Sequence, residues 1–338
     1  MTLQPLPGFK SLETHHCITG SLRHVYVYND HNISEEMLLG LGGGVGFVYW
    51  HVKGQPPFIG GRGNARGGFE PLAGQRTGVK VEAHSTSSAR KAEQALLEIL
   101  DAGQPVMIQC DMGCLPYFDF GGSEYHFGGH VVVVCGYDRE LRQVLIADRD
   151  KELHVVSMDD LEKARSSTYQ PFPPRNTWYT FDFSGKRQPT AGEVRQAIAE
   201  QTHGMLEPPI RNFGVSGIRK AGKMIPRWPD SMGVEELRWS LFNTYVFISP
   251  VGGSGGGLFR TMFGRFLREA AQVTGDTRLD ESADEFQRIG EEWEALGEWF
   301  RQVSEMPAPA SRLGKCVAPL NALAAMEETA WKQIRDIV

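Results

Sequence analysis

Cys17 is the residue of this chain best placed to act as a nucleophile. It follows Thr14, a residue type that can cap a helix. Apolar residues then recur at intervals typical of one helix face, at Ile18, Leu22 and Val25. Cys17 is therefore expected in a first helical turn. Free backbone N–H groups and the positive end of the helix dipole favour a thiolate there, and the thiolate is the reactive form of cysteine.

A histidine and an aspartate later in the chain supply the partners that a nucleophilic thiol needs. His130 begins a β-branched run directly after two glycines, and Asp148 ends the next apolar run. The two runs predict a hairpin. With the turn centred on Arg139, Asp148 pairs directly opposite His130 on an otherwise apolar face. A slip of one residue would move Asp148 to the other face.

The histidines near Cys17 are better suited to other roles. On one helix His24 lies roughly 10.5 Å along the axis from Cys17, too far to share a proton. His16 adjoins Cys17 in sequence but lies about 100° away around a helix. We therefore expect His16 to line the site and to contact the substrate.

The elements that must position these residues indicate an α+β domain with an antiparallel sheet. Prolines between 166 and 190, around a last strand at 178–183, place a boundary near 185. The expected domains are 1–185 and a mostly helical 186–338. Before the boundary, strand-like runs alternate with single helices at 45–52, 89–100, 105–110 and 130–148.

One apolar seam stands out in the second half. Its spacing of three and four residues predicts a helix. A core helix is favoured over a partner-binding helix because the seam lasts barely two and a half heptads. The seam consists of Phe286, Ile289, Trp293, Leu296, Phe300 and Val303.

The chain carries a family resemblance in both halves. Residues 16–23 (HCITGSLR), 33–44 (ISEEMLLGLGGG) and 129–134 (GHVVVV) look like the N-terminal domain of the butirosin biosynthesis protein H family. Residues 255–267 (GGGLFRTMFGRFL) are similar to the C-terminal domain of that family. The order Cys, His, Asp also resembles that of papain-like cysteine enzymes, including the bacteriocin leader peptidases.

The resemblance implies a papain-like acyltransferase of secondary metabolite biosynthesis. Its donor would be an acyl group on the 4'-phosphopantetheine thioester of an acyl carrier protein, and its acceptor a small amine; no bound cofactor is implied. Cys17 would be acylated, His130 would act as base and acid, and Asp148 would orient it. Papain-like peptidases usually have an oxyanion-hole Gln shortly before the Cys, whereas only Gln4 precedes Cys17 here. Backbone N–H groups or His16 are the expected substitutes.

Composition restricts partners and location. The formal net charge of −6 argues against nucleic acid. No apolar run approaches the roughly 18 residues of a membrane span, and residues 1–5 lack the features of a signal peptide. Five cysteines without disulfide-framework spacing agree with a cytoplasmic protein. A basic cluster is a candidate surface for an acidic carrier protein, although a solvated loop is favoured: Arg211, Arg219, Lys220, Lys223 and Arg227.

Two rival site types find little support in the sequence. No metal site is predicted, because the spacing of His126 and His130 interrupted by two glycines does not match a helical zinc motif. The glycine-rich segment 252–257 lacks the Lys and Ser/Thr of a phosphate loop. It precedes a helix, so an anion site for a phosphopantetheine phosphate or a substrate carboxylate, with Arg260 assisting, stays open beside a simple hinge.

Two further functions stay open. The first is a papain-like cysteine peptidase or amidase, in which water replaces the amine. The second is a catalytically inactive binding protein of the same fold. All three candidate catalytic residues are present, which favours an enzyme.

Overall fold

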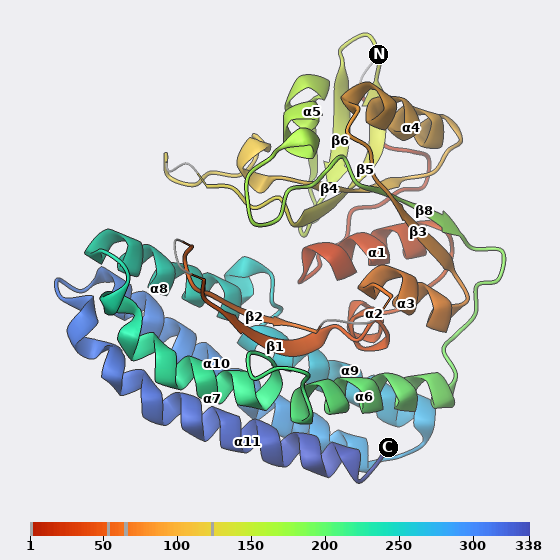
Figure 1. The fold of residues 1–338 in the computed structure, drawn as a ribbon. Helices are drawn as coiled ribbons and strands as arrows, with labels where there is room; N and C mark the ends of the chain where they lie inside the picture. The colour runs from red at the N-terminus through yellow and green to blue at the C-terminus, as the bar shows by residue number, and fades with distance from the viewer. Residues whose placement is uncertain (1–2, 53–54, 64–66, 123–124) are drawn as a thin grey trace. The chain divides into compact units, whose positions relative to one another are not determined.

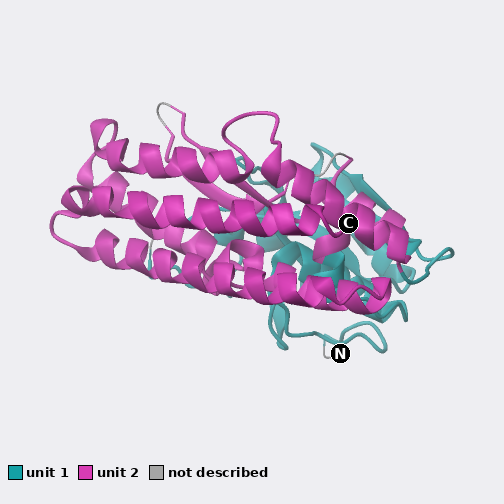
Figure 2. Ribbon diagram, turned by 90° about the horizontal axis from the view of Figure 1, so that it is seen from below, with its two compact units in different colours: residues 1–38, 77–188 teal, residues 39–76, 189–338 magenta. Residues whose placement is uncertain are grey.

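The computed structural model describes residues 3–52, 55–63, 67–122 and 125–338. The chain divides into two compact units (Figure 2). Unit 1 contains residues 1–38 and 77–188, and unit 2 contains 39–76 and 189–338. The last crossing between the units lies close to the expected boundary at 185, whereas 39–76, expected in the first domain, belongs to unit 2.

Unit 1 is built on a six-stranded sheet with the strand order β3-β8-β4-β5-β6-β7 (Figure 1). All neighbouring strands run antiparallel, as expected. The strands are β3 (Lys80–His84), β4 (Val106–Cys110), β5 (His130–Asp138), β6 (Gln143–Ala147), β7 (Leu153–Ser157) and β8 (Trp178–Asp182).

Helices cover the central strands of this sheet. The helices α4 (Ala89–Asp101) and α5 (Met158–Ser166) share an apolar core with β4, β5 and β6. The helix α1 (Cys17–Tyr28) packs along β5. Val131 to Val134 are all buried, which explains why β5 reads as an unbroken apolar run.

Unit 2 is mostly helical, and Figure 2 shows its long helices running alongside one another. A two-stranded antiparallel ribbon, β1 (Val45–Trp50) with β2 (Phe58–Arg62), belongs to this unit. All six residues of the predicted seam are buried in α10, so the core-helix interpretation is confirmed. Phe263, Phe286 and Trp331 pack edge-on or tilted at the centre.

The remaining elements are helices and short 3-10 turns. The helices are α2 (Glu35–Leu41), α3 (Phe69–Thr77), α6 (Ala191–Leu206), α7 (Gly214–Met224), α8 (Val234–Ile248), α9 (Arg260–Thr274), α10 (Arg278–Glu305) and α11 (Val317–Arg335). The 3-10 turns are η1 (Met112–Cys114), η2 (Ile225–Asp230), η3 (Pro250–Gly252), η4 (Gly257–Phe259) and η5 (Pro309–Cys316). Within the described ranges no helix has the length and apolar character needed to cross a membrane.

Candidate active site

Cys17 is the first residue of α1 and its thiol is half-buried. The N-cap is His16, whose Nδ1 accepts the backbone N–H of Thr19 at 3.4 Å, so the expected cap at Thr14 is wrong. The backbone N–H of Thr14 donates instead to the carbonyl of Arg149 at 2.8 Å. This bond ties the residues before α1 to the residue that follows Asp148, and it brings the helix start to the end of β6.

His130 and Asp148 form a buried pair at neighbouring strand ends. His130 is the first residue of β5, and Asp148 directly follows the last residue of β6. The Nε2 atom of His130 lies 2.7 Å from Oδ2 of Asp148. Both side chains are only 3 % exposed. Since Nε2 faces Asp148, Nδ1 is left for the hydrogen bond that His130 makes with Cys17.

The predicted pairing of His130 directly opposite Asp148 is wrong. The ladder pairs Val134 with Ile146 and Val133 with Ala147, with a bulge between Val134 and Gly136. If this register continues to the strand ends, Asp148 lies opposite Val132, which is two residues along β5 from His130. A shift of two residues keeps a side chain on the same face, so the two groups still meet.

Two aromatic residues that the sequence analysis missed complete the environment of the pair. The hydroxyl of Tyr117 donates to Oδ2 of Asp148 at 3.0 Å. The ring of Phe118 meets the His130 ring edge-on, with centroids 5.4 Å apart. Both lie in the connection between β4 and β5. In the sequence, the aromatic-rich stretch before His130 was the only indication that such residues could lie near the site.

The charges of the site favour a thiolate and an imidazolium. Burial raises the pKa of the Cys17 thiol, but the electrostatic interaction with His16 and the hydrogen bonds with His130 and His16 outweigh it, so the pKa lies well below its usual range. Burial lowers the pKa of His130, but the charge and hydrogen bond of Asp148, with the thiol, raise it to about 9. Burial raises the pKa of Asp148, whereas the charge of His130 lowers it more.

Two family models match the chain. Residues 16–149 match the N-terminal domain of butirosin biosynthesis protein H. Residues 159–334, more than half of the chain, match a domain of unknown function, DUF4872. The chain belongs to the butirosin biosynthesis protein H family. No curated protein matches it. The N-terminal family segment runs from the residue before Cys17 to the residue after Asp148, so it brackets all three candidate residues.

In this member of the butirosin biosynthesis protein H family, a glutamate of the N-terminal segment holds the start of α1. The buried carboxylate of Glu35 accepts the backbone N–H groups of His15 and His16, at distances between 2.8 and 3.1 Å. It also accepts the hydroxyl of Thr19 at 2.8 Å. Nothing local in the sequence indicates the contact with His16, because it spans nineteen residues.

The backbone N–H groups and side chains beside Cys17 determine where an oxyanion could be stabilised. The N–H of Cys17 opens the helix and has no intrahelical acceptor. His16 lies beside the thiol, as expected for a residue that lines the site, with Nδ1 turned to Thr19. Gln4 does not supply an oxyanion donor at Cys17. Its backbone carbonyl lies against Gly136, which is about 20 Å along β5 from His130 at roughly 3.3 Å per residue.

His24, which lies too far along the helix from Cys17 to act as its base, is a buried structural residue. Its Nε2 accepts the N–H of Leu12 at 2.8 Å, and its Nδ1 lies 2.8 Å from the carbonyl of Gly20. Burial lowers the pKa of His24 to about 4, so the ring is neutral at pH 7. A neutral ring with both nitrogens engaged has no proton to exchange with Cys17.

The substrate-binding role expected for Arg260 is contradicted by its burial. Its side chain is 0 % exposed and forks onto Glu327 with nitrogen–oxygen distances of 2.8 and 2.9 Å. Its Nη1 donates to the carbonyls of Gly46 and Leu258. In the preceding glycine-rich segment, a Cβ on Gly257 would lie 2.3 Å from Cα of Gly290, so this glycine serves a close helix approach.

The basic cluster lies largely on α7 and η2 and not in a loop. Arg219 pairs with Glu328, and Lys220 donates to Oδ1 of Asn212 at 2.7 Å. Two of the five basic side chains considered as a surface for an acidic carrier protein are therefore paired within unit 2.

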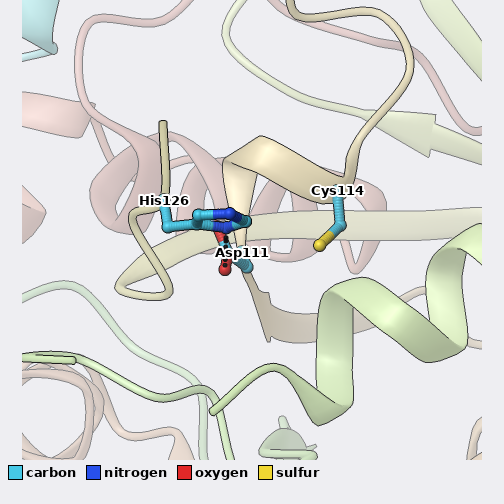
Figure 3. A group of neighbouring side chains, drawn as sticks. All are labelled: Asp111, Cys114 and His126. Carbon is cyan, nitrogen blue, oxygen red and sulfur yellow. Dashed lines mark hydrogen bonds and ion pairs between the residues drawn. The ribbon is translucent and has the colours of Figure 1, made fainter. Parts of the chain in front are cut away.

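A second group of side chains could hold a metal ion, although the sequence analysis predicted none. Asp111, Cys114 and His126 bring their ligating atoms within 4.8 Å of one another (Figure 3). From the sequence, a metal site was weighed on two pairs of like residues four apart, His126 with His130 and Cys110 with Cys114, and neither pair contains Asp111.

Proposed function

We propose that the protein is an acyltransferase that moves an acyl group from a thioester to an amine through an acyl-enzyme at Cys17. The observation that carries the proposal is the hydrogen-bonded series from Asp148 through His130 to a half-buried thiol of lowered pKa at a helix start. A nucleophile, a base and a group that orients the base are the parts that acyl transfer requires.

The same arrangement supports a papain-like fold for unit 1. The cysteine opens a helix, the histidine opens a strand, and the carboxylate follows the next strand of an antiparallel sheet. In this proposal the N–H of Cys17 and the ring of His16 replace the missing oxyanion-hole Gln.

In the first step the Cys17 thiolate attacks the thioester carbonyl, and the carbonyl oxygen becomes an oxyanion. The N–H of Cys17 stabilises this charge. As the tetrahedral intermediate collapses, the carbon–sulfur bond to the donor breaks and His130 gives its Nδ1 proton to the departing sulfur. The products are a free thiol, an acylated Cys17 and a neutral His130.

In the second step an amine attacks the acyl-cysteine while neutral His130 takes one of its protons. The bond between the acyl carbon and Cys17 breaks, so an amide leaves and the thiolate–imidazolium pair is restored. Asp148 holds the ring in place in both steps and stabilises its charged form. Thioester and amine thus become amide and thiol without another reactant.

The family match favours a role in natural-product biosynthesis, since butirosin biosynthesis protein H is named for such a process. We extend this to a donor carried on the 4'-phosphopantetheine arm of an acyl carrier protein, whose thioester suits a cysteine nucleophile.

The test is intact-protein mass spectrometry of the wild type and Cys17→Ala after incubation with simple acyl pantetheine thioesters. An acyl mass on the wild type alone, discharged faster when a small polyamine is added, is the expected result. Discharge at one rate with and without the amine would show a hydrolase. No adduct from any thioester, including carrier-bound ones, would overturn the acyl-enzyme and favour a binding protein.

A further inference from the structure

Asp111, Cys114 and His126 meet beside the end of β4, outside the Cys17 site (Figure 3). We propose that these three side chains form a binding site for Zn²⁺. The inference is independent of the proposed acyl transfer, because none of the three residues belongs to the hydrogen-bonded series at Cys17.

The chain builds this cluster from one tight turn and one returning segment. Asp111 is the N-cap of η1, and the N–H of Cys114 donates to the carbonyl of Asp111 at 3.1 Å. In a 3-10 turn, side chains three residues apart eclipse, so the carboxylate and the thiol project together. The returning segment lies against this turn because Gly113 has no Cβ, which would otherwise stand 1.9 Å from the carbonyl of Tyr125.

The carboxylate is already oriented as a metal ligand would be. Asp111 is fully buried, and its Oδ1 accepts the backbone N–H groups of Gly113 and Phe127, both at 3.0 Å. Its Oδ2 accepts the hydroxyl of Ser167 at 2.6 Å and faces Nδ1 of His126 at 2.9 Å. Hydrogen bonds of this kind fix the ligands in metal sites.

The ligand types and distances suit zinc. Thiolate and imidazole select zinc over magnesium or calcium, which prefer oxygen ligands. Tetrahedral coordination with bonds of about 2.0 to 2.3 Å requires ligand atoms roughly 3.3 to 3.6 Å apart. The longest separations, at most 4.8 Å, reach that range through a contraction of about 1 Å, and the 2.9 Å between Asp111 and His126 widens slightly to admit the ion. One carboxylate and one thiolate neutralise the dication, and a fourth position stays open for water.

The hydrogen bonds within the cluster account for the positions of Asp111 and His126 but give no role to the thiol of Cys114. His126 and Ser167 each make a hydrogen bond with Oδ2 of Asp111, and the thiol of Cys114 takes no part in these bonds. Across the described part of the chain, the sulfur of Cys114 has no hydrogen-bond partner and forms no disulfide. Cys114 and His126 are both half-buried, so an ion can reach them from solvent.

Binding releases the thiol proton of Cys114, and the ring proton that Nδ1 of His126 directs at Asp111 moves to Nε2 so that Nδ1 can coordinate. The ion would then fasten the start of the connection between β4 and β5 to its end. That connection carries Tyr117 and Phe118, which contact Asp148 and His130. The site therefore stabilises the loop that supports the Cys17 site.

The experiment titrates chelator-treated full-length protein with Zn²⁺ in competition with a chromophoric chelator. All variants carry Cys17→Ser, so that the thiol at the other site cannot bind the ion. One Zn²⁺ per chain is expected in this background. Cys114→Ser or His126→Gln should weaken binding by more than 100-fold, and Ser167→Ala by about 10- to 100-fold, as for an outer-shell partner. His203→Gln, at an exposed position of unit 2, is the matched control and should bind as the background does.

Co²⁺ gives a second measurement on the same proteins. A thiolate-to-cobalt charge-transfer absorption is expected in the background variant and absent after Cys114→Ser, with folding checked by circular dichroism. Equal Zn²⁺ affinity with and without Cys114, or no stoichiometric binding in the background variant, would overturn the proposal. Since every variant lacks the Cys17 thiol, neither result depends on whether the protein transfers acyl groups.

Discussion

Oδ2 of Asp148 receives two hydrogen bonds, from Nε2 of His130 at 2.7 Å and from the hydroxyl of Tyr117 at 3.0 Å. The bond to His130 turns the other ring nitrogen toward Cys17, and the negative charge keeps the ring protonated up to a pH of about 9. Asp148 therefore acts on Cys17 through His130 in two ways. It orients the ring toward the thiol, and it maintains the positive charge on the ring that lowers the pKa of the thiol.

Cys17 is expected to react with iodoacetamide at pH 6 to 7, where an ordinary thiol with a pKa of about 8.5 reacts slowly. Replacing His130 with Ala removes a hydrogen bond and a positive charge from the thiol, so its pKa rises. At pH 6.5 the thiolate fraction then falls about 100-fold, but the more basic thiolate is a better nucleophile, so labelling slows roughly 10-fold. Peptide mass spectrometry measures the modification of Cys17, with the half-buried Cys114 as internal reference. An unchanged rate in the variant would contradict the ion pair.

Asp148→Asn should lower the pKa of His130 from about 9 toward the 6.5 of a free histidine, because the charge that holds the proton is lost. NMR titration of the histidine rings, assigned with His130→Gln, measures this change. Acyl transfer should slow by roughly 10²- to 10⁴-fold, the range of a positioned acid–base group.

Tyr117→Phe should have the same kind of effect on the transfer rate as Asp148→Asn, but a smaller one. It removes one hydrogen bond to a charged group and leaves the carboxylate, so a loss of about 10-fold in transfer rate is expected. A Tyr117→Phe protein as slow as Asp148→Asn would mean that the hydroxyl does more than hold the carboxylate.

The sequence predicts the reacting groups and the face on which they meet better than it predicts their register. Alternation and β-branching indicate β5 and β6, but they do not show that the turn is centred between Glu140 and Leu141 and not on Arg139, nor do they reveal the one-residue bulge between Val134 and Gly136. Part of its cause lies far away in the chain. The backbone at Gln4 and Pro5 lies against Gly136, and Leu6 donates its N–H to the carbonyl of Cys135 at 2.7 Å. No local pattern in residues 130–148 contains that information.

The same limit explains why the contacts of Glu35 were missed and the role of Arg260 was wrong. Both stand beside helix starts, where sequence rules predict a cap or an anion site. Their actual partners, the backbone around His16 and the carboxylate of Glu327, come from segments that only the fold brings near. The seam of α10 was predictable because helical periodicity is a local property.

Glu35 should stabilise unit 1 through the start of α1. Glu35→Ala leaves two backbone N–H groups and the hydroxyl of Thr19 without their acceptor, so the free energy of unfolding should fall by at least about 2 kcal/mol. Glu35→Gln keeps an acceptor oxygen and should cost about 1 kcal/mol. Urea titration measures both, with the neighbouring Glu36→Gln as control. A Glu35→Ala protein within about 0.5 kcal/mol of the wild type, the range of ordinary surface substitutions, would refute the capping role.

His24 should make stability depend on pH. Burial lowers its pKa to about 4, whereas an unfolded histidine titrates near 6.5, so below pH 6.5 the unfolded chain binds a proton that the folded chain does not. The contribution of the neutral ring to stability is therefore complete above pH 6.5 and is lost as pH falls, by about 3 kcal/mol at pH 4. His24→Gln does not titrate, so its stability deficit relative to the wild type should shrink by that amount between pH 7 and pH 4. Guanidinium titrations at several pH values measure the difference, and His203→Gln should show no such trend. A deficit that stays constant with pH would mean that His24 has the same pKa in the folded protein as in the unfolded chain.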